Sequence, residues 1–231
     1  MPLILLLETA TKVCSVGLSQ NGKMIALREN KTPDYSHSSL LTVFAEEVIK
    51  EASLAFNQLD AVAVSMGPGS YTGLRIGVSA AKGFCFALNI PLIAVNSLES
   101  LAYVATTKTK EKYDLLVPML DARRMEVYTA VFDQNLHYCE PTNAMIIDKN
   151  SYLDKLAKNK ILFFGDGAAK CREVINHPHA KFNETIHSSA TGLLKPSLLK
   201  FKNRDFENTA YFEPFYLKDF IAAKSKIKGL D

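Results

Sequence analysis

Residues 65–83 read S-M-G-P-G-S-Y-T-G-L-R-I-G-V-S-A-A-K-G and mark the end of a strand and the start of a helix. The apolar run before them stops at Gly67-Pro68-Gly69, because glycine supplies unusual backbone angles and proline cannot continue a hydrogen-bonded ladder. The hydroxyl of Ser70 or Thr72 can cap the helix that follows. This order predicts a buried strand, a tight loop and a helix.

Within that helix, Gly73, Gly77 and Ala81 recur every four residues. Residues at this spacing share one helix face, so this face carries almost no side-chain bulk. Glycine inside a helix costs about 1 kcal/mol relative to alanine. We therefore expect another backbone, a ligand or a partner helix to approach this face closely.

The composition is that of a globular protein. The chain has 231 residues, of which 48% are hydrophobic and 22% charged, enough for one large or two small domains with a sizeable core. The net charge of +3 is too small to indicate a dedicated nucleic-acid binder. The basic excess lies late, at residues 195–204 and at Lys224, Lys226 and Lys228, and is interpreted as a solvated surface, with a weak RNA or partner contact as the alternative.

Cysteine usage and the N-terminal residues indicate a cytoplasmic protein. The four cysteines are widely spaced without a C-x-x-C pair, which is typical of small core residues in a reducing compartment. The apolar run at Leu3–Leu7 is short, has no basic segment before it and ends at Glu8. It therefore predicts a buried strand rather than a signal peptide or a membrane span.

The rest of the chain alternates strands and helices, and the pattern begins again after a charged linker at residues 108–112. This repetition predicts two related α/β halves, at residues 1–107 and 108–231. The expected strands are residues 3–7, 13–19, 23–29, 60–66, 91–95, 115–121, 125–132, 144–147 and 161–164. The expected helices are residues 36–55, the glycine-rich helix, 98–106, 151–158, a short helix after Gly167, and 190–202, followed by an extended segment at 213–218.

Several chemistries are open to these residues. The loop lacks the lysine of a phosphate loop and the sequence of a nucleophile elbow. It could still hold an anion or nucleotide on backbone N–H groups, assisted by Gly69, Ser70, Thr72 and Arg75. A purely structural turn and a partner-facing loop are the alternatives.

The titratable residues give weaker signals. No two histidines are spaced as metal ligands on a predicted helix, and His37 opens the first helix, where a surface role or a partner contact is expected. Glu8 and Asp121 each end a buried strand, the place where α/β folds hold ligands, so they could position magnesium in an ATP-dependent kinase. Local capping and pairing with a nearby arginine explain the same two carboxylates equally well.

Three stretches together resemble the TsaB (YeaZ) family: residues 5–11 (L-L-L-E-T-A-T), residues 67–77 (G-P-G-S-Y-T-G-L-R-I-G) and residues 121–128 (D-A-R-R-M-E-V-Y). The ending P-F-Y-L-K at residues 214–218 is also similar, with Lys218 where arginine is usual and Glu8 where aspartate is common. The resemblance implies a fold of the actin/hexokinase/Hsp70 type (ASKHA), with two related α/β lobes. It also implies a part in forming threonylcarbamoyladenosine beside the anticodon of tRNAs that read ANN codons.

The resemblance further implies that the chemistry belongs to a paralogous partner, TsaD, with an ATPase, TsaE. ATP or ADP and a metal are expected in TsaD, none in this chain alone, because the partner's H-x-x-x-H metal pair falls here on Ser97 and Leu101. Neither side chain can replace an imidazole ligand. The chain is therefore expected to be a non-catalytic scaffold or activating subunit, with an autonomous ATP-dependent kinase and a metallopeptidase as alternatives.

In the same family the first two helices form the partner interface, with TsaD or with a second copy when the chain is alone. The helix at 36–55 carries two neighbouring apolar stripes, so we expect it to pack against two neighbouring surfaces. The expected interface residues are His37, Leu40, Leu41, Phe44, Val48, Gly73, Gly77 and Ala81. Phe44→Glu is expected to abolish pairing while leaving the protein folded, and direct contact of this chain with tRNA stays open.

Overall fold

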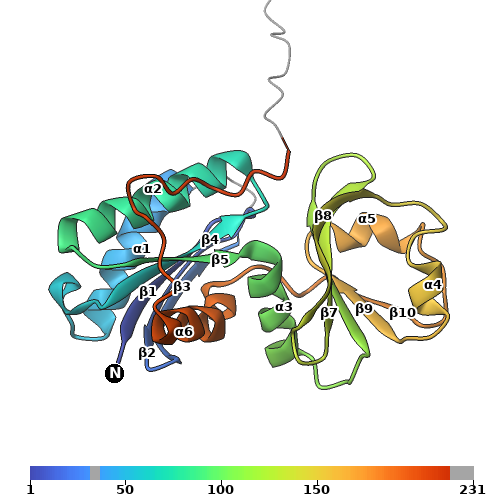
Figure 1. The fold of residues 1–231 in the computed structure, drawn as a ribbon, viewed down its shortest axis with the longest axis horizontal. Helices are drawn as coiled ribbons and strands as arrows, with labels where there is room; N and C mark the ends of the chain where they lie inside the picture. Colours follow the sequence, from blue (N-terminus) through green and yellow to red (C-terminus); the bar gives the residue numbers. More distant parts are fainter. Residues whose placement is uncertain (32–36, 219–231) are drawn as a thin grey trace, which may run out of the picture.

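The computed structural model describes residues 1–31 and 37–218, and within them the chain forms two five-stranded sheets (Figure 1). The first sheet has the order β3-β2-β1-β4-β5. β1, β2 and β3 are antiparallel neighbours, whereas β4 and β5 run parallel to β1. The bounds are β1 Leu3–Glu8, β2 Cys14–Gln20, β3 Lys23–Asn30, β4 Ala61–Gly67 and β5 Leu92–Asn96.

The second sheet repeats this arrangement in the order β10-β9-β6-β7-β8. β6 takes the place of β1, since it lies antiparallel to β7 and parallel to β9. The bounds are β6 Leu115–Asp121, β7 Glu126–Asp133, β8 Tyr138–Ile146, β9 Ile161–Phe164 and β10 Ala180–Asn183. The repeated topology confirms the predicted fold class, two related α/β lobes of the ASKHA type.

Two strands differ from the prediction. β8 begins at Tyr138 rather than at Ala144, because this edge strand is largely exposed and includes Pro141, which an edge tolerates. β10 was not predicted from the sequence. Its four residues are only partly buried at the opposite edge, so they lack the apolar run by which buried strands are recognised.

Helices α1 (His37–Glu51) and α2 (Tyr71–Leu88) pack on one face of the first sheet, with the short η1 (Phe56–Gln58) between α1 and β4 (Figure 1). The side chains of β1 are buried on both faces of the first sheet, which explains why the whole strand is apolar. Leu5 and Leu7 belong to the core under α1 and α2, whereas Ile4 and Leu6 face the opposite side. The predicted helix at residues 36–55 ends earlier, at Glu51.

On the opposite face of each sheet, the helix that follows one sheet in the chain packs against the other sheet. α3 (Ser97–Lys108) follows the first sheet but packs its apolar residues against β6, β7 and β9 of the second. η2 (Ala190–Leu193) and α6 (Leu194–Asn203) follow the second sheet, and η2 packs against Ile4 and Leu6 of the first. The predicted boundary between the two lobes, at 107/108, lies at the end of α3 and stays a prediction.

We call the first sheet with α1 and α2 the first lobe, and the second sheet with α4 (Leu153–Leu156) and α5 (Ala168–Arg172) the second lobe. The residues after α6, 204–218, form a C-terminal strap that runs across α2 to the second lobe (Figure 1). Phe215 N–H donates to the Met66 carbonyl at 2.7 Å, and Lys218 forms an ion pair with Glu126. Within residues 1–31 and 37–218, no helix combines the length and apolar character needed to cross a membrane.

Candidate functional site

The loop at residues 67–70 is fastened to the turn that follows β1. The N–H of Ser70 donates to the Ala10 carbonyl at 2.7 Å. The Ser70 hydroxyl accepts from the N–H of Gly73 at 3.3 Å, so Ser70, rather than Thr72, caps α2. These contacts occupy two of the N–H groups that an anion at this helix end would need.

The small-residue face of α2 packs against the same turn. A Cβ on Gly73 would lie 2.1 Å from the Thr9 carbonyl oxygen, and a Cβ on Gly77 would lie 2.2 Å from the Thr9 hydroxyl oxygen. The Thr9 hydroxyl donates to the Gly73 carbonyl at 2.8 Å. The close approach predicted from the sequence is therefore confirmed, and the group that approaches is the chain's own turn.

Glu8, at the end of β1, is completely buried. Its Oε1 accepts hydrogen bonds from the Ala10 N–H and the Ser65 hydroxyl, both at 2.8 Å, and its Oε2 accepts from the Ser100 hydroxyl at 3.4 Å. Burial raises the pKa of Glu8 to about 7, although these hydrogen bonds oppose the shift. This carboxyl group joins β1, β4 and α3, and water does not reach it.

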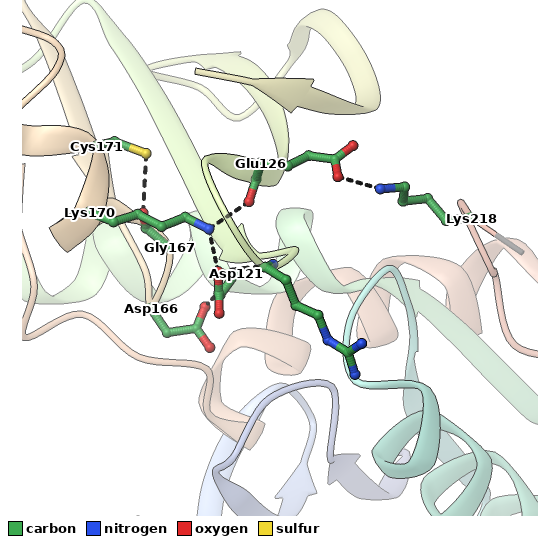
Figure 2. Close-up of polar contacts among 8 residues, drawn as sticks. Asp121, Glu126, Asp166, Gly167, Lys170, Cys171 and Lys218 are labelled. Atoms are coloured by element: carbon green, nitrogen blue, oxygen red, sulfur yellow. Dashed lines mark hydrogen bonds and ion pairs between the residues drawn. The ribbon is translucent and has the colours of Figure 1, made fainter. Parts of the chain in front are cut away.

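Asp121 ends β6, the strand of the second sheet that corresponds to β1, and it is exposed. Figure 2 shows its carboxylate beside Lys170 of α5, with which it forms an ion pair. The Asp121 N–H donates to Asp166 at 3.0 Å, and Lys170 also donates to the Glu126 carbonyl at 2.7 Å. The Asp121 carboxylate is therefore partly neutralised by a cation of the same lobe.

The two carboxylates proposed for a kinase thus have different surroundings. Glu8 is enclosed by hydroxyl and N–H donors, and a magnesium ion would have to displace them. Asp121 is accessible but is paired with Lys170. This arrangement fits a structural role for Glu8 better than a role in binding a metal.

The structure corrects most of the predicted interface residues. His37 is buried, with its Nε2 at 2.8 Å from the Thr11 carbonyl oxygen, and burial lowers its pKa. It fixes the first turn of α1 inside the lobe, so the predicted surface role is wrong. Leu41, Val48, Gly73, Gly77 and Ala81 are also buried within the chain. All five pack within the first lobe, which leaves them no surface to offer a partner.

Leu40 and Phe44 of α1 are half-buried, as an interface residue of a free subunit can be. On α2, the neighbouring half-buried residues are Ile76, Ala80 and Phe84, spaced four apart beside the glycine stripe. We call these five residues the α1–α2 face. The α2 members were not predicted, although their i, i+4, i+8 spacing was visible in the sequence.

Arg75, expected at the loop, lies instead on the exposed side of α2. Its guanidinium stands 4.2 Å from the centre of the Tyr71 ring, and its Nε donates to the Tyr216 hydroxyl at 3.3 Å. Tyr71 and Tyr216 stack with ring centres 4.5 Å apart. Arg75 therefore holds the C-terminal strap on α2, while Gly69 and Thr72 lie at the loop itself.

The two positions at which the resemblance places metal histidines have structural roles here. The Ser97 hydroxyl accepts a hydrogen bond from the Gly67 N–H at 3.1 Å. Leu101 is completely buried in the core between α3 and the second sheet. Within the described residues, no group of three or more potential ligand side chains could hold a metal ion.

Comparisons with known proteins agree with this architecture. A family model described as "TsaD: tRNA N6-adenosine threonylcarbamoyltransferase" matches residues 33–225. The "tRNA threonylcarbamoyladenosine biosynthesis protein TsaB" of Bacillus subtilis is 30% identical over 74% of each chain, and that of Haemophilus influenzae is 24% identical over 98% of this chain and 97% of its own. The structure of YeaZ from Pseudomonas aeruginosa superposes with a TM-score of 0.80 at 25% identity, covering 94% of this chain and all of its own.

A solved activator of 2-hydroxyisocaproyl-CoA dehydratase from Clostridium difficile, with bound ADPNP, shares the fold at a TM-score of 0.50 and 10% identity. It covers 89% of this chain. This last likeness concerns the fold alone. The TsaB relatives and the YeaZ structure, together with the repeated sheet topology and the G-P-G loop on the β1 turn, lead to one conclusion. The chain belongs to the TsaB (YeaZ) family, whose members take part in the biosynthesis of threonylcarbamoyladenosine in tRNA.

Proposed function

We propose that this chain is a non-catalytic, activating subunit of the assembly that transfers a threonylcarbamoyl group to tRNA. In this proposal TsaD performs the chemistry and TsaE supplies ATPase activity. The chain itself binds TsaD and holds it in its active arrangement. On its own it forms a homodimer through the same surface.

The observation that carries this proposal is the pair Ser97 and Leu101. One side chain is engaged with the backbone of the G-P-G loop, and the other is buried in an apolar core. A hydroxyl and an isobutyl group cannot supply the imidazole nitrogens of a histidine metal site. Metal-dependent chemistry at the corresponding place therefore has to come from another subunit.

The surroundings of Glu8 and of the loop at residues 67–70 also support a chain that does not carry out the chemistry itself. The Glu8 carboxyl has a pKa near 7, accepts three hydrogen bonds from the chain itself and is completely buried, so it is not exposed to a substrate. The N–H of Ser70 is used by Ala10, so the loop does not fit a nucleotide phosphate well. An autonomous kinase would need both groups to be available.

The α1–α2 face supplies the binding function. Its five half-buried apolar residues lie on two adjacent helices that already pack on the sheet. Full burial of a large apolar side chain contributes about 1.5–3 kcal/mol, so a few such residues can sustain a stable contact after association costs. We infer that helices of TsaD, or of a second copy, cover this face.

The activity experiment measures threonylcarbamoyl transfer to unmodified tRNA by purified TsaD and TsaE, supplied with threonylcarbamoyl-adenylate, with and without this chain. Modification should depend on its addition, and the chain alone should produce none. If addition changes nothing and the chain hydrolyses ATP by itself, the subunit proposal is wrong and the kinase alternative replaces it.

The interface experiment uses Ala80→Glu, because Ala80 is small and lies in the middle of the α1–α2 face. Phe44→Glu should act in the same direction. Both residues pack against the core, but the larger Phe44 side chain loses more apolar contact, so its substitution has the larger stability cost. Ser79→Glu places the same charge on the adjacent, exposed position of α2 and is the matched control. Ala80→Glu should prevent co-elution with TsaD on size exclusion, and Ser79→Glu should not. Equal behaviour of the two variants would place the interface elsewhere.

A further inference from the structure

We propose that the turn between β6 and β7, through Arg123 and Arg124, contacts phosphate groups of the tRNA backbone. The proposal rests on the proposed function, because that function makes tRNA the substrate of the assembly. It adds a residue-level contact that neither the fold nor the interface requires.

The first observation is the backbone conformation of the turn. Arg123 and Arg124 have φ angles of 69° and 46°, so two consecutive residues with side chains occupy the left-handed region. Glycine, asparagine or aspartate normally fill such positions, because a larger side chain is disfavoured there. The turn is closed by the Glu126 N–H, which donates to the Arg123 carbonyl at 3.1 Å. Backbone conformations of this kind are retained where the side chains serve a function.

The second observation is the charge balance around the turn. Two carboxylates near the turn have lysine partners, Asp121 with Lys170 and Glu126 with Lys218 (Figure 2). The third, Asp166, accepts the N–H of Asp121 at 3.0 Å. Asp121 meets Arg123 only through the backbone, accepting its N–H at 3.2 Å. Both arginines are exposed, and among the described residues neither guanidinium has an ion-pair partner. The turn therefore presents two positive charges that folding does not use.

The third observation concerns the chemistry that these side chains favour. Guanidinium groups bind phosphate oxygens through two parallel hydrogen bonds, and such contacts position a protein on RNA without reading its sequence. An exposed turn needs no matching pocket to make them. The net charge of +3 for the whole chain indicates that such a contact is local, one part of a larger RNA surface in the assembly.

The experiment measures binding of a fluorescently labelled, unmodified tRNA transcript to the reconstituted assembly of this chain with TsaD and TsaE, by anisotropy over a series of salt concentrations. The test variant is Arg123→Gly with Arg124→Gly. Glycine accepts positive φ without strain, so this variant should keep or raise the melting temperature while it removes both charges. The matched control is Lys110→Ala with Lys112→Ala, which removes two exposed charges at the opposite end of β6.

The arginine variant should bind the tRNA roughly 5- to 50-fold more weakly near 0.1 M salt, and the slope of log affinity against log salt should fall in magnitude by about two. The lysine control should change neither quantity comparably. Unchanged tRNA affinity in the arginine variant would overturn the proposal. So would loss of TsaD binding with tRNA affinity otherwise intact, because the turn would then be a protein contact. These outcomes are separate from failure of the proposed function, in which the parent chain would not stimulate modification.

Discussion

The two lobes share one sheet topology but differ greatly in their helices. In the first lobe α1 and α2 are 15 and 18 residues long, whereas α4 and α5 at the corresponding places in the second lobe have 4 and 5 residues. The segment between β3 and β4 has room for a long helix, and the segment between β8 and β9 does not. The first sheet is consequently covered on both faces, and the edge strand β8 of the second is largely exposed.

This difference shows that two lobes with the same sheet topology can present different surfaces, one formed by long helices and one with accessible polar groups. The long helices of the first lobe have an inner face that packs on the sheet and an outer, half-buried face that we propose is covered by a partner. The short helices of the second lobe leave polar groups accessible, including the Asp121–Lys170 pair and the turn after β6. Glu8, at the end of β1, is completely buried, whereas Asp121, at the end of β6, is exposed.

The largest expected effect tests the close packing that seals the first lobe. Gly73→Ala would place a Cβ 2.1 Å from the Thr9 carbonyl oxygen, a backbone atom that cannot rotate away. We expect a loss of about 3 kcal/mol or more in the free energy of unfolding. Urea denaturation followed by circular dichroism measures it, since the chain has no tryptophan.

Two matched substitutions sharpen this result. Gly83→Ala lies in the same helix, with no described atom within 4 Å of the new Cβ, and should stabilise the chain by about 0.5–1 kcal/mol. Gly167→Ala, before α5 of the second lobe, should cost less than Gly73→Ala, because the atoms nearest to its new Cβ, Val127 Cγ1 at 2.9 Å and the Leu120 carbonyl carbon at 3.0 Å, lie farther away than the Thr9 oxygen at 2.1 Å. A Gly73→Ala variant as stable as Gly83→Ala would contradict the packing described for α2.

The second effect concerns the buried carboxyl of Glu8. Its pKa is about 7 in the folded chain and about 4.5 when exposed, so between these values the folded state keeps a proton that the unfolded state has lost. Stability therefore falls as the pH rises from about 4.5 to about 7, by up to about 3 kcal/mol. Glu8→Gln should remove this dependence and be the more stable form at pH 8.

Glutamine suits this site, because one oxygen atom accepts both short hydrogen bonds of Glu8 and the new amide group faces Ser100. Denaturation at pH 5 and pH 8 gives the comparison, with stability at pH 5 expected to be similar in the two forms. Asp121→Asn, which removes the exposed carboxylate at the end of β6, should leave the pH profile of the parent chain in place. A Glu8→Gln variant that is less stable than the parent at pH 8 would refute a raised pKa as the source of the dependence.

The smallest effect concerns the contact of the C-terminal strap with the second lobe. Lys218→Ala removes the ion pair with Glu126, in which both side chains are partly exposed. Such pairs contribute about 0–1 kcal/mol, so the melting temperature should change by only a few degrees at most. The strap keeps its other bonds, including the one from Phe215 to Met66, and differential scanning calorimetry should still give one transition. A loss well above this range would mean that the strap is needed to hold the lobes together.

Local signals predicted the fold well because each depends on neighbouring residues. The apolar run of β1, the turn at Gly67-Pro68-Gly69 and the cap at Ser70 were all visible in short windows. The glycine stripe correctly indicated a close approach, but not the group that approaches. Thr9 lies far from Gly73 in the sequence, and only the parallel pairing of β1 with β4 brings the two together.

The sequence by itself determined the alternation of strands and helices, the tight loop before α2, the duplicated order and the family to which the chain belongs. Tertiary structure decided which apolar residues of α1 and α2 are buried, because a helix with two apolar stripes can use either one against the sheet. It also decided that α3 and η2 pack on each other's sheets and that Glu8 is completely buried. Among the described residues, it leaves both arginines of the β6–β7 turn exposed and without an ion pair. These outcomes depend on contacts between residues distant in the chain, and local patterns carry no information on which of them form.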